Sequence, residues 1–173
     1  MKEIQCIYAL LLIGTLFTSC EKSNLNYQNS FDSNYQEWLS FKQTSGNSYH
    51  YVVSGGSVFG PASQTDITVT NGKVTQRHFK YTTLTGLENI PVEALEWTEN
   101  ENEINSHPNS GAEALTLDQI YEKARTEWLI KRKDVSVYFE ANNNGMISSC
   151  GYVPDGCMDD CFRGITISSV GLL

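Results

Sequence analysis

The chain has 173 residues, 40% of them hydrophobic, and a formal net charge of -8 at pH 7. This length suits one ordinary domain with a substantial apolar core, and the share of Tyr, Phe, Val, Ile and Thr favours β structure. The acidic balance argues against nucleic acid and anionic lipid headgroups as partners, because binding to either requires clustered Lys and Arg.

Residues 1–19 have the pattern of an export signal. Lys2 precedes an apolar run at 7–14, which is too short to span a bilayer stably but suits the core of a signal peptide. The stretch Leu16-Phe17-Thr18-Ser19-Cys20 follows and resembles the lipobox of bacterial lipoproteins, although Phe17 stands where the usual pattern has Leu. The resemblance implies cleavage before Cys20 and a diacylglyceryl thioether on its Sγ.

A lipid on Cys20 would anchor the mature chain in a membrane, so the expected location is the cell envelope, at the outer membrane. Residues 20–29 lack a hydrophobic period and are rich in Asn, Ser and Gln, which predicts a flexible tether. Residues 30–173 are expected to form a single domain.

The domain is predicted to begin with a helix at 34–43. Ser33 and Gln36 have the spacing of a capping box before an apolar face. That face contains Tyr35, Trp38 and Leu39. Residues 49–53 are dense in strand-forming side chains and predict the first strand.

A β-hairpin is predicted around Asn71-Gly72. Ile67 and Val69 alternate with threonines before this pair, and Val74 follows it. Asn-Gly is favoured in such turns because both positions need a positive φ.

Residues 88–114 are acidic and show no sustained helix or strand period. They are predicted to form a mobile insertion with one helical turn near 91–97 and with Trp97 packed back on the domain.

The clearest helix prediction begins at Thr116 and ends near Lys131. Thr116 and Gln119 are spaced as a capping box, and an apolar stripe follows them. The stripe consists of Leu117, Ile120, Tyr121, Ala124 and Trp128.

Three more strands are predicted after this helix, at 135–139, 146–152 and 164–168, with a turn at 142–145 between the first two. The element order is then roughly α-βββ-α-βββ. We therefore predict an α+β fold, with an antiparallel sheet of about five to six strands and two helices on one face.

Several short motifs occur in a characteristic order along this domain. They are Trp38, Tyr49 and Tyr51, 71–74, 116–121, 135–139, 144–147, Asp159-Asp160 and 164–167. This series resembles bacterial secreted proteins of domain-of-unknown-function family 6174, over about residues 35–170. The resemblance implies the same fold and export, but no activity, because none is established for the family. The insertion at 88–114 and the loop cysteines depart from its pattern.

Three cysteines follow the expected lipid site: Cys150, Cys157 and Cys161. Outside the cytosol, neighbouring cysteines normally form a disulfide. Cys157 with Cys161 is the favoured pair, since one turn brings their Cα atoms within bonding reach, and Cys150 with Cys161 is the alternative. A zinc site completed by His50 or His78, or a redox pair, fits the spacing less well.

Asp155, Asp159 and Asp160 crowd the same loop and are candidate binding residues. Their oxygens suit calcium, although turn-forming aspartates that accept backbone hydrogen bonds explain the cluster equally well. The sequence contains none of the common hydrolase, metalloprotease or phosphate-loop motifs, so no catalytic residue, metal ligand or cofactor is predicted.

These observations predict a membrane-anchored envelope lipoprotein that acts as a binding or interaction module, with an unidentified protein or ligand as its partner. A small inhibitor-type envelope protein and a hydrolase with an unrecognised site are the alternatives.

Overall fold

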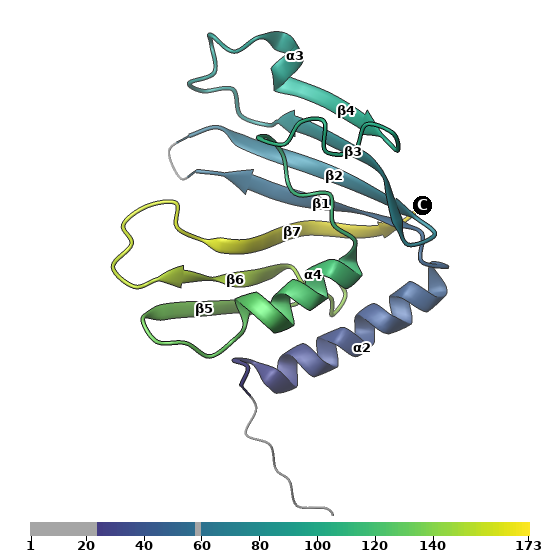
Figure 1. Ribbon diagram of the computed structural model, residues 1–173, viewed down its shortest axis with the longest axis vertical. Helices are drawn as coiled ribbons and strands as arrows, with labels where there is room; N and C mark the ends of the chain where they lie inside the picture. The colour runs from purple at the N-terminus through teal and green to yellow at the C-terminus, as the bar shows by residue number, and fades with distance from the viewer. Residues whose placement is uncertain (1–23, 58–59) are drawn as a thin grey trace, which may run out of the picture.

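The computed structural model describes residues 24–57 and 60–173, so the predicted export signal and Cys20 lie outside the described residues. Within that part of the chain, seven antiparallel strands form one sheet in the order β4-β3-β2-β1-β7-β6-β5 (Figure 1). The strands are β1 (Tyr49–Gly56), β2 (Ala62–Thr70), β3 (Lys73–Tyr81), β4 (Glu96–Asn100), β5 (Val135–Glu140), β6 (Ser149–Pro154) and β7 (Arg163–Leu172).

The strand order shows two units placed side by side. In each unit a helix is followed by an antiparallel run of strands, and β1 of the first unit pairs with β7 of the second. The predicted α+β class and antiparallel sheet are confirmed, and Asn71 (φ 51°) and Gly72 (φ 77°) form the turn between β2 and β3. The sheet has one strand more than the upper end of the prediction, because β4 lies within the acidic insertion.

The helical elements are α2 (Gln28–Thr44), α3 (Val92–Leu95), α4 (Leu117–Lys123) and the π-helical turn η1 (Ala124–Trp128). The predicted capping box is present at α4: the Gln119 N–H donates to Thr116 Oγ1, and the Thr116 N–H donates to Gln119 Oε1. None of the described helices is both long enough and apolar enough to cross a membrane.

The first helix differs from its prediction. It begins at Gln28 rather than at 34, and Leu39 on its predicted apolar face is exposed. Just before it, Leu25 forms a β-bridge with Ile130, and the Asn26 N–H donates to the Leu129 carbonyl. The prediction of a flexible tether is therefore wrong for residues 24–29, because backbone hydrogen bonds and helix formation order them.

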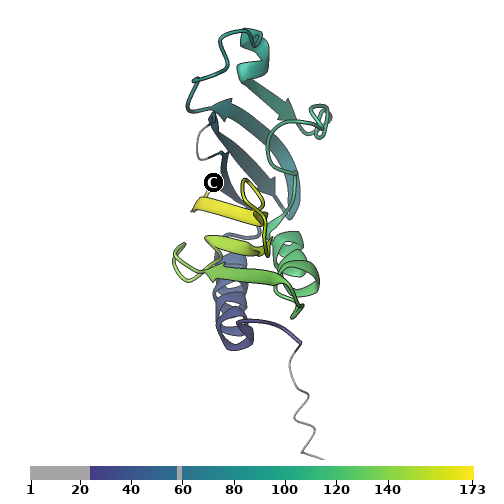
Figure 2. The ribbon, with the colours of Figure 1, turned by 90° about the vertical axis from the view of Figure 1, so that its left-hand side faces the viewer.

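One face of the sheet, which we call the inner face, carries the core. Trp38 of α2 packs edge-to-face on Tyr49 of β1 and stacks on Tyr121 of α4. Phe31 of α2 reaches Phe139 of β5. These contacts place α2 beside α4. In Figures 1 and 2, α4 lies in front of β5 and β6 and α2 runs below it past the β5 edge of the sheet, while residues 101–115 run from the end of β4 back across β3 and β2.

Candidate functional site

A cleft of about 440 Å³ opens on the inner face, between residues 111–115, the α4–η1 junction and neighbouring ends of β1, β2 and β7. Its apolar part is formed by Val53, Trp128 and Ile165, each of which is less than a tenth exposed. Four charged side chains also line it. They are Glu113, Lys123, Glu127 and Arg163.

Two of these charges satisfy each other. Lys123 Nζ lies 2.8 Å from Glu113 Oε2 and 5.9 Å from the centre of the Trp128 ring. The other two, the guanidinium of Arg163 and the carboxylate of Glu127, make no hydrogen bond or ion pair with any described residue. The cleft therefore presents one cation and one anion that are open to a ligand.

The helical side of the cleft has an unusual backbone. The Leu129 N–H donates to the Ala124 carbonyl at 2.9 Å, which closes a π-helical turn directly after α4. Lys123, Glu127 and Trp128 come from this junction. Single π-turns are rare and often occur at functional sites.

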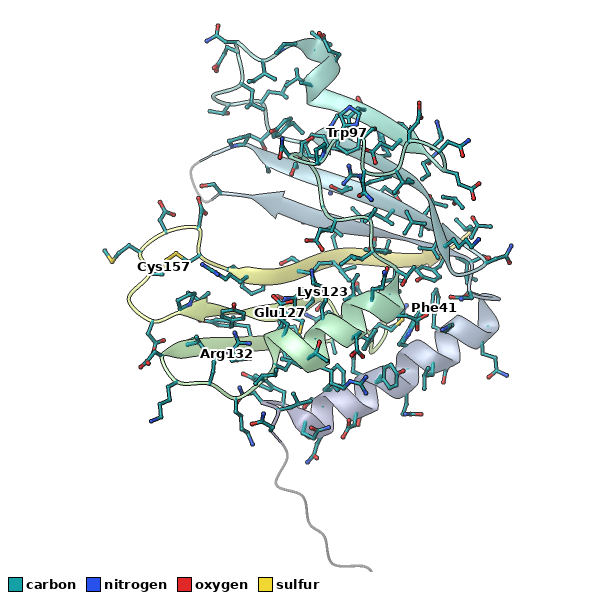
Figure 3. The ribbon with its side chains drawn as sticks, viewed as in Figure 1. Phe41, Trp97, Lys123, Glu127, Arg132 and Cys157 are labelled. Carbon is teal, nitrogen blue, oxygen red and sulfur yellow. A yellow bond between two sulfur atoms is a disulfide. The ribbon has the colours of Figure 1, made fainter. Side chains whose placement is uncertain are left out.

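Arg132 holds the end of the π-turn against the sheet. Its guanidinium donates to the Glu127 carbonyl and lies 4.0 Å from the centre of the Tyr152 ring on β6. Figure 3 shows Lys123, Glu127 and Arg132 on the helical side of the inner face, away from Trp97. The backbone that carries Glu127 is thus tied to the sheet.

The opposite wall of the cleft depends on a buried ion pair. Arg77 and Glu99 side chains are 3% and 0% exposed, and two hydrogen bonds of 2.9 and 2.7 Å join them. Arg77 also donates to the carbonyls of His107 and Ala112, while Thr65 Oγ1 accepts from the Ala112 N–H. These bonds place Ala112 and the adjoining Glu113 at the cleft.

The Glu99 carboxylate is surrounded by donors. Burial alone raises its pKa, but hydrogen bonds from the Arg77 guanidinium, the backbone N–H groups of His107 and Asn105, and the His107 ring outweigh burial and lower the pKa to about 2. Glu99 is therefore ionised throughout the neutral range.

This network corrects the prediction of a mobile insertion. Trp97 is 8% exposed and stacks between Phe79 and His107, with ring centres 5.2 and 4.2 Å away. The predicted helical turn (α3) and the inward packing of Trp97 are confirmed. β4 was missed because its two buried positions are Trp97 and Glu99. With a glutamate at the second position, the sequence does not show the alternation of apolar and polar residues that is typical of a strand.

The structure places a disulfide between Cys157 and Cys161, whose Cα atoms are 6.2 Å apart, in the exposed β6–β7 loop. Cys150 is a free thiol buried on β6, and burial raises its pKa to about 12. The alternative pairing with Cys150 is therefore not the one formed.

The three aspartates of that loop do not form a shared site. Asp155, Asp159 and Asp160 are all exposed, and Asp155 accepts a hydrogen bond from Ser136 Oγ at 3.4 Å. Across the described residues, no group of three or more His, Cys, Asp or Glu side chains is placed to hold a metal ion. The calcium and zinc interpretations thus lack a ligand set there.

The outer face of the sheet carries two separate histidine–carboxylate pairs. His50 Nδ1 lies 3.5 Å from Asp66 Oδ1, and His78 Nε2 lies 2.9 Å from Glu96 Oε1. Both pairs are partly exposed. Neither of these histidines lines the inner-face cleft, so the cleft does not bring together the Asp, His and Tyr side chains that a typical hydrolytic site would need.

Comparisons of the chain with protein-family models, with curated proteins and with solved structures find no match. The resemblance to family 6174 stays a prediction.

Proposed function

We propose that this protein is a lipid-anchored binding module of the cell envelope that holds its ligand in the inner-face cleft. The observation that carries the proposal is the cleft itself, which combines an apolar floor with the charges of Arg163 and Glu127, neither of which has a partner among residues 24–57 and 60–173. Ligand sites typically measure roughly 300–1,000 Å³ and place a few polar groups around an apolar lining. The cleft has this size and composition.

Binding suits the cleft better than catalysis does. Its hydroxyl groups come from Ser63 and Thr65, and Thr65 Oγ1 already accepts from the Ala112 N–H. Neither His nor Cys lines the cleft to act as base or nucleophile. The side chains that remain open, Arg163 and Glu127, are suited to holding charged groups.

The cleft can be tested by filling it. Ser63 lines the cleft on the inner face, whereas its neighbour Gln64 points to the outer face, where it lines a separate hollow. We expect Ser63→Trp to abolish, and Gln64→Trp to preserve, the amide shifts that ligands cause at 111–115 and 123–128. NMR titration of the mature domain with a small-molecule and peptide library measures this. If no compound shifts these amides, or both variants respond alike, the cleft is not the binding site.

The anchor is tested separately at Cys20, which the lipobox resemblance marks as the first mature residue. Cys20→Ala is expected to retain the leader, lose the lipid mass and move the protein out of the membrane fraction. Mass spectrometry and fractionation of the full chain measure all three properties. An unchanged mass and unchanged membrane partitioning in the variant would contradict the envelope proposal.

A further inference from the structure

Arg163 and Glu127 stand in one cleft without pairing with each other. Both side chains are exposed, and an exposed ion pair contributes only about 0–1 kcal/mol, so little free energy favours their pairing. Here the two side chains start from elements with fixed positions. Arg163 begins β7 and lies opposite Tyr152 of β6, while Glu127 lies on η1, which contacts both strands.

The backbone around Glu127 is restrained from two sides. The π-turn bond from Leu129 to Ala124 fixes its local geometry, and Arg132 ties its carbonyl to the Tyr152 ring. Lys123, four residues before Glu127 at the end of α4, is paired with Glu113, and Arg125 of η1 is paired with Glu122. Glu127 is thus left as a carboxylate without a partner in the described chain.

The charges of the cleft also balance. Arg163 and Lys123 oppose Glu113 and Glu127, so the lining has no excess of either sign. A simple anion would meet the two carboxylates, and a simple cation would meet the two basic groups. A ligand that carries one negative and one positive group, separated by an uncharged part, can place the negative group on Arg163 and the positive group on Glu127.

We propose, as an extension of the proposed function, that the cleft binds a short peptide with free termini. The peptide carboxylate lies on Arg163, whose planar guanidinium suits bidentate carboxylate binding, and the ammonium lies on Glu127. An apolar side chain of the peptide packs on the floor formed by Val53, Trp128 and Ile165. Lys123 and Glu113 remain paired and close the side of the cleft.

The test uses four forms of one ligand, the dipeptide Ala-Leu: free, N-acetylated, C-amidated and blocked at both ends. Calorimetric titration into the mature domain is expected to show about a 10- to 100-fold loss of affinity for each blocked terminus, the range for a hydrogen bond to a charged group. Arg163→Gln is expected to weaken binding of the free dipeptide and to remove the effect of amidation. Glu127→Gln is expected to weaken binding likewise and to remove the effect of acetylation.

Matched controls lie on the same helical segment. Glu122 and Arg125 form an exposed ion pair with each other and do not line the cleft. Glu122→Gln and Arg125→Gln make the same changes of charge and are expected to leave all four affinities within twofold of the wild type. Equal thermal midpoints for the four variants show that folding is not the cause of any loss.

Three results separate this inference from the proposed function. If blocking a terminus does not change affinity, or Arg163→Gln weakens all four forms equally, the zwitterion assignment is wrong. If no form binds but the cleft-filling test with Ser63→Trp identifies another ligand, the inference fails while the proposed function stands. If no form binds and that test also finds no ligand, both fail.

Discussion

The two halves of the inner face are covered by different physical means. Over β1 and the β7–β5 strands, α2 and α4 bury aromatic side chains against each other and against the sheet. Over β2–β4, residues 101–112 form no helix or strand and are held by the buried pair Arg77–Glu99. A charged pair with several directed hydrogen bonds here takes the place of an apolar helix.

The difference predicts different tolerance to substitution. Apolar packing is non-directional, so related side chains can replace one another at modest cost. A buried charge, in contrast, becomes strongly destabilising when its partner is lost. We call β2–β4 with residues 101–112 the segment-covered half, and β1 with β5–β7 the helix-covered half. The stability of the segment-covered half should therefore depend on fewer residues, and substitution of one of them should cost more free energy of unfolding than a substitution in the helix-covered half.

The largest expected effect is that of Glu99→Gln. The substitution leaves the Arg77 guanidinium buried without its counter-ion, so the free energy of unfolding should fall by about 3–5 kcal/mol, as urea denaturation measures it. Glu96→Gln is the matched control: its carboxylate is 62% exposed beside His78, and it should cost less than about 1 kcal/mol. Equal effects of the two variants would show that burial of the pair is not what stabilises this half.

Replacing both partners sharpens the same comparison. Arg77→Met combined with Glu99→Met removes the isolated charge, and the double variant is expected to recover most of the stability lost in Glu99→Gln. Hydrogen exchange at residues 105–112 should nevertheless increase, because the bonds from Arg77 to the His107 and Ala112 carbonyls are gone. Unchanged exchange there would mean that Trp97 stacking alone holds the segment.

Acid should loosen the segment-covered half first. The Glu99 pKa falls from its ordinary 4.5 to about 2 on folding, so its stabilisation is complete above pH 4.5 and is lost as the pH falls toward 2. At about 1.4 kcal/mol per pKa unit this amounts to on the order of 3 kcal/mol. Urea denaturation between pH 7 and pH 2 should show a steeper loss for the wild type than for the Met/Met variant, and parallel curves would contradict this.

The helix-covered half was largely predictable because its signals are local. The residues of the capping box at Thr116 and those of the apolar stripe on α4 each lie within a few positions of one another. The start of α2 was missed because Tyr27 caps it in a left-handed conformation (φ 57°) without any side-chain hydrogen bond. No standard helix-start residue marks that position.

In the segment-covered half the Asn71-Gly72 turn, α3 and the inward packing of Trp97 were predicted, but the Arg77–Glu99 network was not, and neither was the cleft, because the partners in both are distant in sequence. Glu99 on β4 pairs with Arg77, which lies directly opposite it on β3. Arg163 and Glu127 line the same cleft although they are far apart in the sequence. Among the acidic residues of 88–114, nothing local distinguishes the buried Glu99 from its exposed neighbours. Its alternation with Trp97 was the one available signal for β4.

Removing the disulfide should have a moderate effect in the helix-covered half. Cys157 and Cys161 are four residues apart, so chain entropy attributes about 2 kcal/mol at most to their bond. The double variant Cys157→Ser/Cys161→Ser is expected to lower the urea midpoint accordingly, and reducing the wild type should give the same midpoint. A much larger loss would show that the loop also supports the sheet through contacts beyond the closed ring.

The smallest expected effect is that of Thr116→Ala, which removes a single cap from the helix-covered half. Thr116 Oγ1 accepts from the Gln119 N–H, and losing such a cap typically costs about 1 kcal/mol in urea denaturation. Thr116→Ser keeps the hydroxyl and should cost much less. Because Tyr49 and Tyr51 also bond to the backbone at Leu117 and Leu115, the helix start should stay docked in both variants. A loss for Thr116→Ala as large as that for Glu99→Gln would mean that directed hydrogen bonds, and not apolar packing, stabilise both halves alike.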